Sequence, residues 1–140
     1  MIWIGRANKN RLQVILTSLF SDFRAKSMFT VAKYAKGNKL TAQAETNARR
    51  TVAFINDVLE SIPNHLRIVE TVRTPQQNAV VKAPENSKHL TTFAAAVDFA
   101  PIGKRAKDDL PEQLQAVCDR HQFAMKVFNV RSRQKYHCEF

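Results

Sequence analysis

The stretch from residue 73 to residue 98 constrains the fold most, because it forms a polar connection between two predicted strands. Thr74 is a good N-cap, and Pro75 follows it at the first helical position. This pair predicts a short helix, with Arg73 immediately before its N-cap. The connection ends in an Ala- and Val-rich run that reaches Asp98. We expect this run to be a buried strand, so the side chains of the polar turn lie at one end of it.

Two side chains of this segment have the character of metal ligands. His89 lies in the polar turn, and Asp98 lies on the strand that follows. A histidine and a carboxylate can supply two ligands of a tetrahedral zinc, and a catalytic site needs a third ligand and an open position for water. His137, flanked by strand-forming residues near the end of the chain, is the best candidate for the third ligand.

Three short runs surround these residues. They are residues 73–79 (Arg-Thr-Pro-Gln-Gln-Asn-Ala), 87–91 (Ser-Lys-His-Leu-Thr) and 96–99 (Ala-Val-Asp-Phe). Together they resemble the signature of the D-Ala-D-Ala carboxypeptidase family of zinc peptidases, whose phage members include cell-wall endolysins. The resemblance covers about residues 28 to 140, and it implies Zn²⁺ held by His89, Asp98 and His137.

The resemblance also implies a substrate-binding role for Arg73, Ser87 and Gln76. A guanidinium between a strand and a helix can clamp a carboxylate or the oxyanion of a tetrahedral intermediate. The alternative for Arg73 is a surface salt bridge. Ser87 stands two residues before His89, where it could equally be a turn residue.

The chain departs from the family pattern in the spacing of two ligands. The family places its histidine and aspartate seven residues apart, whereas His89 and Asp98 are nine apart. Ala94 stands where the family has a glycine.

The general base is the second departure. At the two places where the family carries its catalytic carboxylate, this chain has Gln134 and Lys126. Glu139 lies two residues beyond His137 and would share its face of a strand, so it is the remaining candidate for the base.

Two functions follow from these observations. In the first, the protein is a zinc peptidase that cuts a peptide bond next to a D-amino acid in bacterial cell-wall peptidoglycan. In the second, the domain keeps the fold but has lost the chemistry, and it serves as a basic binding or virion structural module. The intact ligand set favours the enzyme, and the missing carboxylate favours the module.

Length and composition predict a single domain over residues 1–140, with 1–27 as a helical extension and 28–140 as the family-like core. No run approaches 18 apolar residues, so we expect no membrane span. The apolar start, Met1 to Ile4, is too short for a signal peptide. We therefore expect synthesis in the cytoplasm, with action at the cell wall or from a phage virion.

The net charge of +10 is unevenly distributed. Residues 1–44 carry eight basic side chains against Asp22, and residues 120–140 carry five against Glu139. If the two ends lie together, they form a face that attracts a polyanion such as nucleic acid or cell-wall polymer. The alternative is a surface that only improves solubility.

The remaining histidines and both cysteines have structural interpretations. His65 precedes a strand and His121 ends a helix, where a cation is favoured. Cys118 and Cys138 do not form a disulfide framework, so we expect buried thiols.

These patterns predict an α+β fold, with helices on one face of a small, mostly antiparallel sheet and the zinc site on its open face. The predicted helices are 8–25, 41–62, 74–81 and 109–121, and the predicted strands are 66–71, 95–99, 123–130 and 135–140. The first helix is amphipathic, which favours packing against the domain over lying on a membrane surface.

Overall fold

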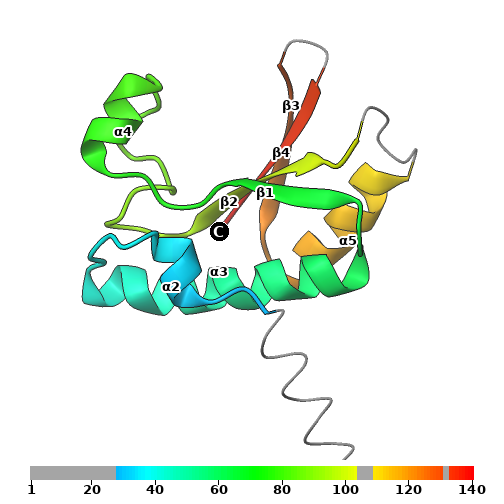
Figure 1. The fold of residues 1–140 in the computed structure, drawn as a ribbon, viewed down its shortest axis with the longest axis horizontal. Coiled ribbons are helices and arrows are strands. Elements are labelled where there is room, and N and C mark those ends of the chain that lie inside the picture. Colours follow the sequence, from blue (N-terminus) through cyan, green and yellow to red (C-terminus); the bar gives the residue numbers. More distant parts are fainter. Residues whose placement is uncertain (1–27, 104–108, 131–132) are drawn as a thin grey trace, which may run out of the picture.

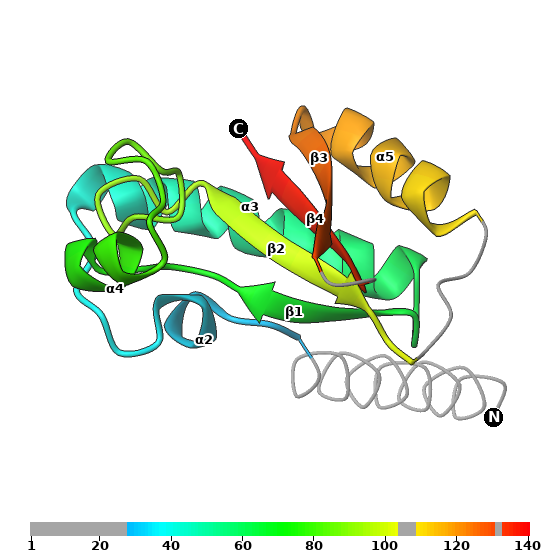
Figure 2. The same ribbon diagram turned by 90° about the horizontal axis from the view of Figure 1, so that it is seen from above.

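The computed structural model describes residues 28–103, 109–130 and 133–140, and the predicted helix 8–25 lies outside them. The fold is α+β, as predicted, with an open four-stranded antiparallel sheet of order β1-β2-β4-β3. The strands are β1 (Leu66–Glu70), β2 (Ala96–Pro101), β3 (Ala124–Val130) and β4 (Arg133–Glu139). Seen from above, the sheet is twisted, and β4 lies between β2 and β3 (Figure 2).

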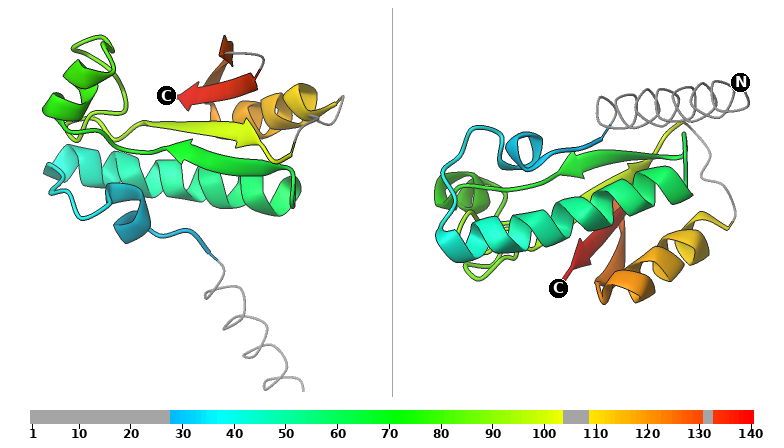
Figure 3. Two further views of the ribbon diagram at one scale, coloured as in Figure 1. Left: turned by 45° about the horizontal axis from the view of Figure 1, so that its top comes forward. Right: turned by 90° about the horizontal axis from the view of Figure 1, so that it is seen from below.

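The described helices are α2 (Val31–Ala35), α3 (Ala42–Ser61), α4 (Pro75–Val80) and α5 (Leu110–His121). The long helix α3 runs along one face of the sheet, and α5 lies beside it at the β3 side (Figures 1 and 3). The short helix α4 and the loop after it stand at the end of the sheet where β1 stops and β2 begins (Figure 1). None of the described helices is long and apolar enough to span a membrane.

Helix α3 begins and ends where the sequence predicts. The Thr41 side chain caps it by accepting a hydrogen bond from the Ala44 N–H at 3.1 Å, and Pro63 follows its C-cap. Its apolar stripe, which includes Val52 and Ile55, is buried against the sheet. Burial of this stripe fixes the side of the sheet that the helix covers.

An aromatic cluster joins α3 to the sheet. Phe54 of α3 stacks on Phe123 with ring centroids 4.1 Å apart, and its edge meets Phe99 of β2 at 6.2 Å. Tyr136 and Cys138 of β4 are also fully buried in this core. Both cysteines are free and buried, as predicted.

Alternation along the strands separates this core from the opposite face of the sheet. Side chains of successive strand residues point to opposite faces. Phe99 and Tyr136 belong to the core, so their strand neighbours Asp98 and His137 point to the other side. The packing of the core therefore decides where the polar side chains of β2 and β4 lie.

Helix α4 forms from the predicted Thr-Pro signal. Thr74 accepts a hydrogen bond from the Gln77 N–H while the Gln77 side chain accepts one from the Thr74 N–H, which is a complete capping box. The buried Asn78 then donates to the carbonyl oxygens of Ala83 and Pro84. These bonds tie the following loop to the helix.

Three features differ from the prediction. Strand β2 ends at Pro101 rather than at residue 99, because its pairing with β1 extends to Pro101 opposite Leu66. The short helix α2 was not predicted, because its five residues bury only Tyr34 and Ala35 and show no full helical period. Strand β4 begins at Arg133 rather than at residue 135, because its pairing with β3 extends to Val130 opposite Arg133. The predicted hairpin is otherwise confirmed.

A polar cluster joins the C-terminal ends of α3 and α5. Asp57 contacts His121 Nε2 at 2.7 Å and Arg120 Nη2 at 3.2 Å, and it accepts a bond from the Ser61 hydroxyl. Partial burial pushes the pKa of Asp57 up, but the hydrogen bonds from His121, Ser61 and Arg120 lower it to about 2. His121 thus contacts α3 through Asp57, which fits the structural role expected for it.

We expect Asp57→Asn to lower the free energy of unfolding by about 1 kcal/mol at neutral pH. Because folding lowers the pKa of Asp57, its contribution is present above about pH 4 and is lost as the pH falls toward 2. Thermal melts between pH 5 and pH 2 should therefore show a smaller loss of stability in Asp57→Asn than in the wild type. The exposed Asp119→Asn on α5 is the matched control, and parallel curves for all three proteins would contradict the prediction.

Candidate metal centre

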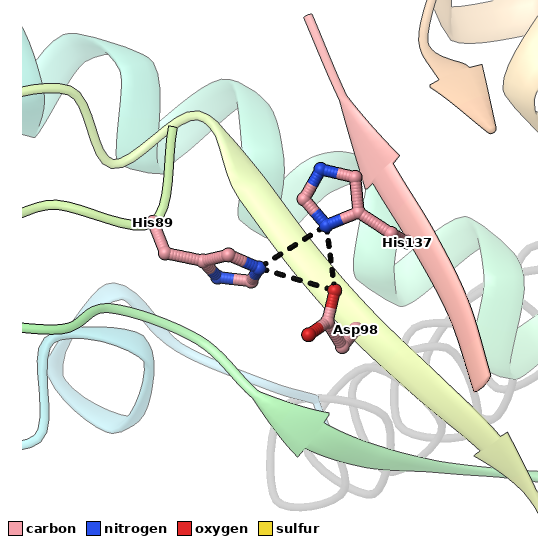
Figure 4. A group of neighbouring side chains, drawn as sticks. All are labelled: His89, Asp98 and His137. Atoms are coloured by element: carbon pink, nitrogen blue, oxygen red, sulfur yellow. Dashed lines mark hydrogen bonds and ion pairs between the residues drawn. The ribbon is translucent and has the colours of Figure 1, made fainter. Parts of the chain in front are cut away.

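Three side chains from distant parts of the sequence converge on one point. His89 Nε2 lies 3.1 Å from Asp98 Oδ1 and 3.2 Å from His137 Nδ1, and His137 Nδ1 lies 2.7 Å from the same Asp98 oxygen (Figure 4). His89 and Asp98 are buried, and His137 is half-buried. These are the three predicted ligands.

The sheet positions two of them directly. Asp98 of β2 is paired with His137 of β4 in the antiparallel ladder, so both side chains rise from the same face. His89 enters from the loop after α4 and points toward β2 (Figure 4). Its backbone carbonyl accepts a hydrogen bond from the Arg73 N–H at 2.8 Å, which ties the His89 loop to the chain just beyond β1.

The loop between His89 and Asp98 is two residues longer than in the family that the sequence resembles. Ala94 has φ of 50°, the left-handed conformation for which glycine is best suited, and it stands where the family has glycine. Two side chains of α3 hold this turn: Asn47 donates to the Phe93 carbonyl at 2.9 Å, and Thr51 donates to the Ala94 carbonyl at 3.1 Å. The longer spacing therefore still brings both ligands to one point.

The outer nitrogen of His89 is fixed by a backbone group. Nδ1 lies 2.6 Å from the carbonyl oxygen of Thr71, which can only accept, so Nδ1 carries a proton. Thr71 is itself held, because its hydroxyl donates to the Tyr34 carbonyl at 2.7 Å. In neutral His89, the lone pair of Nε2 then faces Asp98.

The other two ligands also have partners for their outer atoms. Nε2 of His137 lies 3.2 Å from Glu139 Oε1, and Nδ1 lies 2.7 Å from Asp98 Oδ1, so each nitrogen of this ring faces a carboxylate oxygen. The second oxygen of Asp98 lies 3.6 Å from the Lys135 ammonium. The sequence did not indicate Thr71 or Lys135 as partners of these residues, although the two-residue strand period that identified Glu139 also places Lys135 on the same face of β4.

The inner atoms of the three residues lie within hydrogen-bond distance of one another. A metal would need both inner nitrogens unprotonated, and their lone pairs and the Asp98 oxygen would then face the cation. Donor atoms of a tetrahedral zinc lie about 3.3 Å apart, since each is about 2.0–2.2 Å from the metal. The two separations from His89 Nε2, 3.1 and 3.2 Å, are close to this value, and the 2.7 Å between His137 Nδ1 and Asp98 Oδ1 is the length of a charge-assisted hydrogen bond. His89, Asp98 and His137 can thus hold a metal ion.

Without a metal, the contacts among the charged groups outweigh the effect of burial on the pKa values of Asp98 and His137. Burial raises the pKa of Asp98, but hydrogen bonds from His137 and His89 and their charges outweigh it, so the pKa is lowered. Burial lowers the pKa of His137, yet Asp98 and Glu139 raise it above its ordinary value. Protons therefore compete with a metal for His137, and metal affinity falls as the pH falls.

The predicted substrate residues are differently placed. Arg73 donates from Nη2 to Ser87 Oγ at 3.2 Å, and Ser87 Oγ also accepts from the His89 N–H at 3.3 Å. Ser87 thus links Arg73 to the ligand loop. Gln76 is exposed on α4.

Arg73 has unused hydrogen-bonding capacity. Its Nε is buried and has no acceptor among the described residues. A hollow of about 290 Å³ opens beside it. The hollow is lined by Lys36, Glu70, Arg73, Gln77, Val80 and Val81. Arg73 belongs to this lining, whereas His89, Asp98 and His137 do not.

The structure also describes Lys126 and Gln134, which stand at the two positions where the resembled family carries its catalytic carboxylate. Lys126 of β3 is paired directly with His137. Gln134 lies on the opposite face of β4 from His137, where it accepts a hydrogen bond from the Tyr136 hydroxyl at 2.6 Å. Neither position supplies an acid to the cluster.

Comparisons with protein-family models, curated proteins and solved structures found no match to this chain. The resemblance to the zinc peptidases therefore rests on the motif residues alone.

We expect the purified protein to bind about one zinc ion, and His137→Ala to weaken that binding by about 3 kcal/mol or more, roughly 100-fold, through loss of one of three ligands. Metal content after exposure to excess zinc and dialysis measures this. His65→Ala, a histidine outside the cluster, is the matched control. Wild-type protein that retains no zinc would show that the cluster is not a metal site.

Proposed function

We propose that this protein is a zinc-dependent peptidase that hydrolyses a peptide bond in bacterial cell-wall peptidoglycan, as a phage endolysin does. The observation that carries the proposal is the convergence of His89, Asp98 and His137, whose potential ligand atoms all lie within 4.8 Å of one another. Two histidines and one carboxylate are the ligands of several zinc hydrolases, which keep a fourth position for water or substrate. The motif resemblance supplies the substrate class.

The chemistry that zinc supplies in such a site is a water of lowered pKa and a polarised carbonyl. The protein's part is to fix the ligands and to stabilise the charge that develops on the substrate. We assign the second task to Arg73. Its buried Nε, which has no acceptor in the part of the chain that the structure describes, and its link through Ser87 to the His89 loop support this role.

The direct test uses zinc-loaded protein and peptidoglycan fragments of different peptide chemotypes. We expect new amino termini to appear with the wild type and not with Asp98→Asn, which removes a charged ligand. Zinc-bound wild-type protein that releases no amino termini from any chemotype would overturn the peptidase proposal.

We expect Arg73→Ala to keep zinc but to lower the hydrolysis rate by about 10²- to 10³-fold, the usual effect of removing one oxyanion donor. Metal content and initial rates measured on the same preparation separate these two effects. Arg49→Ala is the matched control, because Arg49 is exposed and paired with Glu45 on α3. A wild-type rate in Arg73→Ala would show that Arg73 does not act on the substrate.

The second candidate function is a catalytically inactive module that binds a polyanion. It is favoured by Lys126 and Gln134, which stand where the family has its carboxylate. Lys126 instead adds a positive charge directly beside His137.

If the basic residues form a polyanion-binding face, affinity for DNA or for cell-wall sacculi should fall steeply as salt rises, because binding releases counterions. Titrations at several salt concentrations measure the slope. Absence of binding at low salt would leave the charge of +10 as a contribution to solubility.

A further inference from the structure

Glu139 occupies a specific place relative to the ligand ring of His137. It is the last residue of β4, two positions after His137, so both side chains rise from the same face. Its Oε1 lies 3.2 Å from His137 Nε2, on the far side of the ring from Nδ1. The Glu139 side chain is 31% exposed, so solvent reaches the carboxylate from outside.

Two carboxylates compete for the orientation and the proton of this ring. Asp98 Oδ1 lies 2.7 Å from Nδ1 and would favour a proton there, which would block the lone pair that a metal needs. Glu139 favours the proton on Nε2 instead. A carboxylate on the outer nitrogen of a metal-binding histidine fixes its tautomer and raises its basicity.

We propose that Glu139 is a positioning residue that keeps His137 Nδ1 available to the metal, rather than the general base suggested by the sequence. The inference rests on the metal centre of the proposed function. The two roles make opposite demands on the side chain. A base must reach the reacting water, whereas in this geometry the carboxylate is engaged at the outer edge of the ligand ring.

The roles differ in what Glu139→Gln and Glu139→Ala change. Glutamine keeps an oxygen that can accept the Nε2–H bond, and alanine removes it. For a positioning residue, Glu139→Ala should weaken zinc binding by about 10- to 100-fold, and Glu139→Gln should restore most of that affinity. For a general base, Glu139→Gln should leave zinc affinity unchanged and lower the rate by about 10²- to 10⁴-fold.

The experiment measures zinc affinity by competition with a chelator, and the peptidoglycan hydrolysis rate at saturating zinc, for the wild type and both variants. Glu45→Ala is the matched control, since Glu45 is an exposed glutamate of α3 paired with Arg49. Thermal melts show whether each variant is folded. We expect weakened affinity in Glu139→Ala, recovery in Glu139→Gln, and a rate in Glu139→Gln within about 10-fold of the wild type once the site is saturated.

The outcomes separate this inference from the proposed function. Unchanged zinc affinity in folded Glu139→Ala would overturn the positioning role alone, as would a rate collapse in Glu139→Gln without loss of zinc. Wild-type protein that binds zinc but cuts no peptide would overturn the peptidase proposal, while the affinity series would still decide the role of Glu139. Wild-type protein that binds no zinc would overturn both.

Discussion

The direct pairing of Asp98 with His137 across β2 and β4 is the constraint on which the site depends. A slip of one residue in an antiparallel ladder would send every side chain of one strand to the other face. The slip is prevented by the core, because Phe99 and Tyr136, the strand neighbours of the pair, are fully buried under α3 and α5. The hydrophobic packing thus holds a carboxylate and an imidazole in contact on the other face.

The outer partners of the ligands distinguish this cluster from an ordinary buried His–Asp network. In such a network each histidine donates to the carboxylate, and its second nitrogen is often free to find water. Here the Thr71 carbonyl accepts from the outer nitrogen of His89, and the Glu139 carboxylate faces the outer nitrogen of His137. The inner atoms lie at hydrogen-bond distance from one another, and the same three side chains can hold a metal ion.

The sequence predicted the elements that have strong local signals. Thr41 and the Thr74-Pro75 pair mark the starts of α3 and α4, and the ligands could be identified because histidine and aspartate have distinctive chemistry. The partner of His89 could not be predicted, since Thr71 contributes a backbone carbonyl that every residue type possesses. The contact of Glu139 depends on a rotamer, which a strand period does not fix: the period placed it beside His137 without saying which atom it would meet.

The two departures from the family pattern differ in their physical consequences. The longer spacing between His89 and Asp98 is absorbed locally, because Ala94 adopts the left-handed conformation and Asn47 and Thr51 of α3 hold the carbonyls of the turn. The nine-residue spacing therefore still brings His89 and Asp98 together. The catalytic carboxylate of the resembled family is not replaced by another acid at either of its two positions. Lys126 is basic, and Gln134 faces the other side of β4. Glu139 is the carboxylate that β4 brings to this face, and it contacts the outer nitrogen of His137. Under the proposed peptidase function, proton transfer would therefore be the step in which this chain differs from the family that it resembles.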